Sequence, residues 1–226
     1  MPKAPRLTAK QASLLRADLA QSGWGVESVE ALLGPVAAAA LQRELRAPAL
    51  RVVRRALVAG AGAASTSSAA NAPQGGDVAG YKVAVLTALF MLGEPVSAAA
   101  LETALPRTGV AGALAIGLVV PTQSASGEQR YAPAVDLRPH EAEDAHGSVR
   151  WWVASDLGEL VTGQALAPDH VLGIGRAGLT LAALTPRKPV ETALDLGVGC
   201  GIQTLYLLRH AQHVVATDIS ARALAF

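Results

Sequence analysis

An acid and a run of glycines near residue 200, followed by a second acid, have the types and spacing of a nucleotide-cofactor site. The apolar run Val190–Leu196 contains Asp195, three glycines follow at every second position, and a second apolar run ends in Asp218. Glycines let a backbone turn sharply and approach a ligand without Cβ clashes, and the first turn of the next helix offers free N–H groups. The stretch 202–209 resumes at helical spacing, so the order strand, loop, helix, strand predicts a cofactor half-site.

The spacing of the glycines separates two kinds of cofactor loop. Dinucleotide enzymes use G-x-G-x-x-G, with a pyrophosphate on the helix N-terminus, but Ile202 stands where the third glycine would fall. The pattern Gly197, Gly199, Gly201 fits G-x-G-x-G instead. Asp218 lies 218 − 195 = 23 residues after Asp195, which is enough for one helix and one strand.

With these residues the sequence resembles the class I S-adenosylmethionine-dependent methyltransferases, whose first motif is an acid followed by G-x-G-x-G after the first strand. The resemblance implies that Asp195 lies near the methionine amino end of the cofactor and that the three glycines line its methionine and ribose portion. It also implies that Asp218 accepts hydrogen bonds from the ribose hydroxyls and that Ile219 borders the adenine.

A closer resemblance comes from the residues around Asp218. The run Thr-Asp-Ile-Ser at 217–220 is similar to the branch of release-factor glutamine and rRNA guanine-N2 methyltransferases, and 169–175 matches the position of a segment that closes over the cofactor there. That branch uses an Asn-Pro-Pro-Tyr-type motif, which does not occur in this sequence. We therefore expect the catalytic element beyond Phe226, and expect this chain to bind S-adenosylmethionine weakly and to turn over nothing.

Two other functions remain open from the sequence. The chain could be a nucleic-acid-binding or interaction module with a vestigial half-Rossmann tail. Salt-dependent binding of RNA or DNA that survives deletion of residues 190–226 would favour this function. It could also be a nicotinamide-dependent oxidoreductase, which Ile202 disfavours. The methyltransferase resemblance itself implies N-methylation of a macromolecular substrate, RNA or protein.

The expected fold class is α/β, with an N-terminal helical and winged-helix-like region before the first part of a Rossmann-like methyltransferase domain. The expected parts are a helical region at 1–58, a flexible Ala/Gly/Ser linker at 59–80, a winged-helix-like module at 81–140 and an incomplete methyltransferase domain at 147–226. The linker is expected because its composition buries little and orders at high entropic cost.

Capping residues and periodicity predict the individual elements. Thr8 caps the first helix and Gly23 follows its end. Further helices are expected at 28–33, 35–46, 81–92, 96–105, 108–116, 157–161, 175–184 and 202–209. Strands are expected at 118–121, 131–135, 151–153, 190–196 and 213–217, and Glu141, Glu143 and Asp144 are expected in a solvated loop.

The charge distribution limits the partners. Residues 1–60 contain nine Lys or Arg and four Asp or Glu, a formal charge of 9 − 4 = +5. Residues 61–226 contain ten and fourteen, a formal charge of 10 − 14 = −4. Arg51, Arg54 and Arg55 share one helical face, a weak indication of phosphate contact. In the winged-helix-like module, the expected recognition segment 106–117 contains one basic residue, Arg107, and in the expected wing the charge of Glu128 balances that of Arg130. So little positive charge favours packing or substrate positioning over binding in a nucleic-acid groove.

The single cysteine, Cys200, excludes an intramolecular disulfide and a multi-cysteine zinc site. No signal peptide is visible, and no stretch supplies the roughly 20 apolar residues needed to span a bilayer. We therefore expect a cytoplasmic protein without a membrane partner or a metal. Cys200 lies in the glycine loop, where we expect its backbone to contribute and its thiol not to react.

Overall fold

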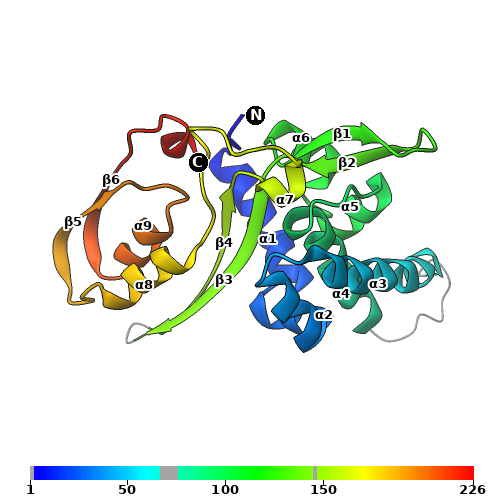
Figure 1. The fold of residues 1–226 in the computed structure, drawn as a ribbon, viewed down its shortest axis with the longest axis horizontal. Helices are drawn as coiled ribbons and strands as arrows, with labels where there is room; N and C mark the ends of the chain where they lie inside the picture. The colour runs from blue at the N-terminus through cyan, green and yellow to red at the C-terminus, as the bar shows by residue number, and fades with distance from the viewer. Residues whose placement is uncertain (1–2, 67–75, 145–146) are drawn as a thin grey trace. The chain divides into compact units, whose positions relative to one another are not determined.

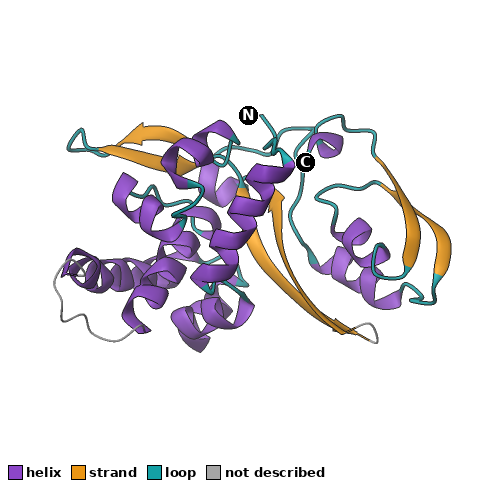
Figure 2. Cartoon of the chain, turned by 180° about the vertical axis from the view of Figure 1, so that it is seen from behind, coloured by secondary structure: helices purple, strands orange, loops and turns teal. Residues whose placement is uncertain are grey.

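The chain is a mixed α/β protein that divides into two compact units (Figure 1). The computed structural model describes residues 3–66, 76–144 and 147–226. One unit is Leu7–Ala134 and the other is Val135–Phe226 together with the short segment that ends at Arg6. Helices make up most of the first unit, whereas the second unit combines a long hairpin with a parallel strand pair and short helices (Figure 2). Residues 7–58 and 81–134 of the expected regions thus belong to one compact unit, whereas residues 135–140 belong to the other.

The first helix, α1 (Ala9–Ser22), confirms its predicted start and end. Thr8 forms a capping box with Gln11, since its hydroxyl accepts from the Gln11 N–H and the Gln11 side chain accepts from the Thr8 N–H at 2.9 Å. Gly23 ends the helix in the left-handed conformation, with φ of 70°.

The next helix, α2 (Val26–Leu41), contains a kink at the predicted break. Gly34 has a non-helical φ of 68°, and Pro35 begins the second segment of the helix. The expectation that this segment runs to Arg46 is wrong, because a turn follows Leu41 and Arg46 instead begins α3 (Arg46–Thr66).

Helices extend into the expected linker from both sides. The helix α3 continues to Thr66, and α4 (Gly76–Leu86) begins before residue 80. The rest of the expected linker, 67–75, lies outside the described residues. The predicted helix 81–92 is confirmed, although its end is the buried π-helix η1 (Thr87–Met91), where the indole N–H of Trp24 donates to the Thr87 hydroxyl at 3.1 Å.

The predicted short helices and two strands follow in the first unit. Ser97 caps α5 (Ala98–Ala104), and α6 (Gly109–Ala115) comes next. The antiparallel pair is β1 (Val119–Gln123) and β2 (Gln129–Pro133), which correspond to the expected strands 118–121 and 131–135.

The second unit begins with a hairpin that the sequence predicted only in part. Strand β3 (Asp136–Asp144) pairs along its whole length with β4 (Gly147–Ser155). The expected acidic loop at Glu141–Asp144 is therefore wrong. Glu141 lies opposite Arg150 in the register, and the Arg150 Nε–H donates to Glu141 at 2.8 Å, so a cross-strand charge pair helps to stabilise this acidic stretch as a strand.

The remainder of this unit confirms the predicted order of helices and strands. It contains α7 (Glu159–Thr162), α8 (Arg176–Leu184), β5 (Val190–Leu196), α9 (Ile202–Leu207), β6 (Ala211–Thr217) and the 3-10 turn η2 (Ala223–Ala225). Strands β5 and β6 are parallel, and α9 connects them. A small core of Val153, Ala182, Ile202 and Tyr206 packs β4, α8 and α9 together.

Among the described residues, no single helix is both long and apolar enough to cross a membrane. Taken together, α1 and α2 have the length and apolar composition of a membrane span, but the chain bends by 48° between them.

Candidate functional site

The predicted cofactor residues meet at the carboxyl ends of β5 and β6. In the parallel register Asp195 pairs with Ala216, and Leu196 pairs with Thr217. The glycine loop (residues 197–201) follows β5, and Asp218 follows β6, so both lie at the same edge of the pair. This edge is where ligands bind in open α/β sheets.

The backbone of the glycine loop requires its glycines. Gly197, Gly199 and Gly201 have φ of 85°, 52° and 80°, in the left-handed region that side chains disfavour. A Cβ at any of the three would meet nothing within 4 Å. Backbone conformation, rather than crowding by protein atoms, therefore explains these glycines, and the space beside them is open to a ligand.

Hydrogen bonds hold the glycine loop against the end of β6. The N–H groups of Gly197 and Val198 both donate to the carbonyl of Thr217, at 2.8 and 2.9 Å. The Gly201 N–H donates to the Val198 carbonyl at 2.8 Å and closes the turn before α9. The loop is thus tied to the strand that presents Asp218.

Asp218 joins the glycine loop to the turn that follows β6. Its Oδ1 accepts from the Ser220 N–H at 2.8 Å, and its Oδ2 accepts from the Gly199 N–H at 3.0 Å. These bonds from Ser220 and Gly199 lower the pKa of Asp218, so the carboxylate is ionised at neutral pH. A carboxylate offers about four acceptor sites, so Asp218 retains the capacity to accept from a ligand hydroxyl.

Ile219 and Asp195 differ in their surroundings. Ile219, next to Asp218, is fully exposed and free to cover an aromatic ligand. Asp195 is buried, and the Thr204 hydroxyl of α9 donates to its Oδ2 at 2.6 Å. The resemblance implies that Asp195 lies near the cofactor, and in this structure its contact with Thr204 joins β5 to α9. No local sequence pattern singles out Thr204.

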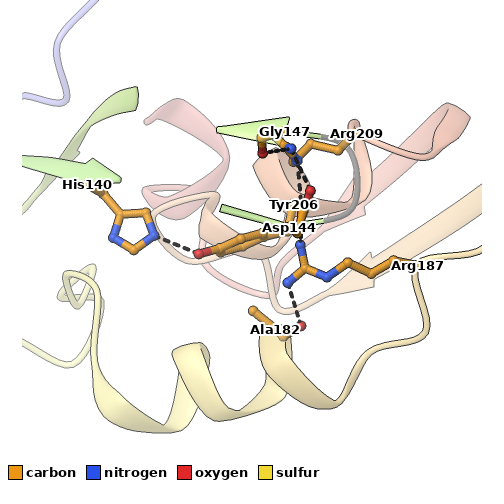
Figure 3. Close-up of polar contacts among 7 residues, drawn as sticks. All are labelled: His140, Asp144, Gly147, Ala182, Arg187, Tyr206 and Arg209. Carbon is orange, nitrogen blue, oxygen red and sulfur yellow. Dashed lines mark hydrogen bonds and ion pairs between the residues drawn. The ribbon is translucent and has the colours of Figure 1, made fainter. Parts of the chain in front are cut away.

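A second set of side chains, the Asp144 cluster, fixes the far end of α9 (Figure 3). Asp144 of β3 accepts from Arg187 and from Arg209, with Arg209 Nη2 at 2.6 Å and Arg209 Nε at 3.1 Å. Arg209 also donates to the Gly147 carbonyl at 2.5 Å. These ion pairs are largely buried, since the Arg209 side chain is 8% exposed and that of Asp144 is 12% exposed.

An aromatic layer completes the Asp144 cluster. The hydroxyl of Tyr206 and His140 Nε2 lie 2.8 Å apart in a hydrogen bond, and Arg187 lies over the Tyr206 ring at 4.8 Å (Figure 3). Trp151 packs edge-on against Tyr206, with ring centroids 5.2 Å apart. Burial lowers the pKa of His140, although Glu141 opposes this, so the ring favours the neutral form. The sequence does not indicate this cluster, because its members are distant along the chain and no local pattern links them.

Other candidate residues have structural partners. Burial is the main cause that raises the pKa of the Cys200 thiol, which packs beside the small core, so the thiol is not activated. Arg54 pairs with Glu94 at 2.7 Å on the helical face that it shares with Arg51 and Arg55. Over the described ranges, no group of three or more His, Cys, Asp or Glu is arranged to hold a metal ion.

Comparisons with known proteins reach only part of the chain. A family model described as a domain of unknown function (DUF7059) matches residues 21–130. This match lies inside the unit Leu7–Ala134 and does not reach the glycine loop. No curated protein matches the chain.

Proposed function

We propose that residues 190–220 form the cofactor-binding element of an S-adenosylmethionine-dependent methyltransferase that N-methylates RNA or protein. The observation that carries the proposal is the ionised Asp218 carboxylate, held by the Gly199 and Ser220 N–H groups at the carboxyl end of a parallel strand pair. A carboxylate in this position suits the two hydroxyls of a ribose, because each carboxylate oxygen can accept from one hydroxyl.

The surroundings of Asp218 suit the other parts of the cofactor. Open space beside the glycines leaves room for an extended methionine and ribose chain, and the exposed Ile219 offers an apolar surface to adenine. The cofactor supplies the methyl group on a sulfonium. In the whole enzyme these residues would hold the cofactor and fix its direction, which is a contribution through proximity and orientation.

The β5–α9–β6 unit supports a Rossmann-like fold for this part of the chain, because parallel neighbours joined by a helix are the repeating unit of such domains. The position of Ile202 argues against a dinucleotide. Ile202 is 6% exposed and belongs to the small core, with its Cγ2 3.7 Å from where a Cβ on Gly178 of α8 would lie. A bulky core residue thus occupies the position where dinucleotide loops need a glycine for close packing.

For the first unit we propose a winged-helix-like module that helps to position the macromolecular substrate. The order α5, α6, β1, β2 supports this interpretation. Groove binding to nucleic acid is disfavoured because the Arg107 guanidinium donates to Asp18 and Gln21, and Arg130 pairs with Glu128 at 3.2 Å. These partners already neutralise or occupy the cations that would contact phosphate.

Equilibrium dialysis of the 226-residue chain with radiolabelled ligands tests the cofactor class. We expect saturable binding of S-adenosylmethionine and S-adenosylhomocysteine at millimolar concentrations and no binding of NAD. Asp218→Asn should weaken binding about tenfold. The asparagine amide keeps only one acceptor oxygen, so it cannot accept from both backbone N–H groups and from the ribose hydroxyls as the carboxylate can.

Glu191→Gln is the matched control for this substitution, since Glu191 is an exposed carboxylate on the neighbouring strand β5, at the end away from the glycine loop. This variant should bind like the unmodified chain. Binding of NAD in place of S-adenosylmethionine, or equal effects of the two substitutions, would contradict the proposal.

A further inference from the structure

A buried ion pair lies next to the turn that carries Asp218. Asp156 follows β4, and its side chain, 2% exposed, accepts from Arg222 Nε at 2.7 Å and also from Arg222 Nη2. The same carboxylate accepts from the Val171 N–H at 2.9 Å, and the Asp156 N–H donates to the Val171 carbonyl at 3.1 Å. Asp156 therefore connects the segment 169–175 with the residues after β6.

Arg222 is linked to Asp218 by a compact hydrogen-bonded turn. The Ser220 N–H donates to Asp218 Oδ1 at 2.8 Å, and the Ser220 hydroxyl accepts from the Ala223 N–H at 3.2 Å. The Ser220 carbonyl accepts from the Leu224 N–H at 3.2 Å. A displacement of Arg222 therefore moves the turn in which Asp218 sits.

Apolar packing contributes little to holding this turn. Ile219 is fully exposed and Leu224 is 56% exposed, while Ala223 is buried but small. The Arg222 side chain, in contrast, is only 13% exposed. A two-pronged contact between a guanidinium and a carboxylate fixes both distance and direction, which a lysine would not do.

We propose that Asp156 and Arg222 are positioning residues that orient the Asp218 carboxylate toward the ribose diol of the cofactor. This inference rests on the proposed function, since it assumes a ligand ribose at Asp218. The ion pair with Asp156 fixes the position of Arg222, and the hydrogen-bonded turn at Ser220 connects Arg222 to Asp218. The Asp218 oxygens are thereby held in the direction that two neighbouring hydroxyls require. The same pair fixes Val171, so the segment 169–175 and the ribose site share one anchor.

The test compares the affinity of the chain for adenosine with its affinity for 2′,3′-dideoxyadenosine, which lacks both hydroxyls. The unmodified chain should prefer adenosine roughly tenfold or more, because the diol bonds to a charged acceptor. In Arg222→Gln the affinity for adenosine should fall to that for the dideoxy compound, while the affinity for the dideoxy compound stays unchanged. Arg222→Lys keeps the charge without the two-pronged contact and should show an intermediate preference.

Arg209→Gln is the matched control, because Arg209 also forms a buried ion pair in this unit but contacts Asp144 and not the Asp218 turn. It should keep the preference for adenosine. An unchanged preference in Arg222→Gln, or an equal loss of both affinities, would overturn the inference. If the unmodified chain itself does not prefer adenosine, the proposed ribose site fails, and the inference fails with it.

A measurement on the unmodified chain avoids any dependence on how the variants fold. The Nε–H resonance of Arg222 should shift when adenosine binds and should stay in place with the dideoxy compound. A resonance that responds equally to both ligands contradicts a link between Arg222 and the ribose hydroxyls.

Discussion

Substituting Asp144 by asparagine should destabilise the second unit far more than substituting a neighbouring acid of the same hairpin. The asparagine side chain would keep the shape of the aspartate but lose the charge that faces Arg187 and Arg209. Removing one partner of a buried ion pair costs about 3–5 kcal/mol, because it leaves buried charge uncompensated. Arg187 is 23% exposed and can partly regain hydration, so we expect the lower end, about 3 kcal/mol.

The matched control is Glu141→Gln, in the same strand β3. Its ion pair with Arg150 is exposed, at 31% for Glu141 and 54% for Arg150, so its loss should cost less than about 1 kcal/mol. Hydrogen exchange of peptides from β4 and α9 at increasing urea concentrations measures the free energy of opening for each variant. Equal opening free energies for the two variants would show that the Asp144 cluster does not fix α9.

Three further predictions concern the loop, the first unit and pH. Gly201→Ala should destabilise the second unit by about 1–2 kcal/mol in the same exchange experiment, because φ is 80° while no atom crowds a Cβ; no loss would contradict this. Asp18→Asn should cost about 1–3 kcal/mol and speed exchange in α6, because the buried Asp18 carboxylate accepts from the Thr108 N–H at 2.8 Å; unchanged exchange in α6 would count against it. Burial lowers the pKa of His140 below 6.5, so on acidification the unfolded chain protonates this ring before the folded chain does. The contribution of His140 to the free energy of unfolding is therefore present above pH 6.5, and it should be lost as the pH falls from 6.5 through the pKa of the folded state. His140→Gln should flatten that part of the pH profile of urea unfolding, and an unaltered profile would exclude His140 as its cause.

Elements set by local chemistry could be predicted from the sequence. The capping box at Thr8, the break at Gly34 and the alternate glycines after β5 each depend on residues that are close neighbours along the chain. The order strand, helix, strand is also local, and a helix between two strands favours the parallel pairing that β5 and β6 have.

Features set by distant contacts could not be predicted. The acidic end of β3 looked like a loop because its partner, Arg150, acts across the strand pair and is not part of the local pattern. Arg222 and Asp156 are separated by 66 positions, so nothing in the residues around either one indicated their pairing. Thr204 lies on the helix after the loop, and only the folded β5–α9 arrangement brings it to Asp195.

The most direct test of the ribose site is a map of backbone amide shifts in the ¹⁵N-labelled chain on addition of S-adenosylhomocysteine. We expect the largest changes on the amides of the glycine loop and of Ser220, because the Gly199 and Ser220 N–H groups donate to the carboxylate that the ribose would engage. Shifts concentrated elsewhere, or no shifts at saturating ligand, would show that Asp218 and the glycine loop do not bind an adenosyl cofactor.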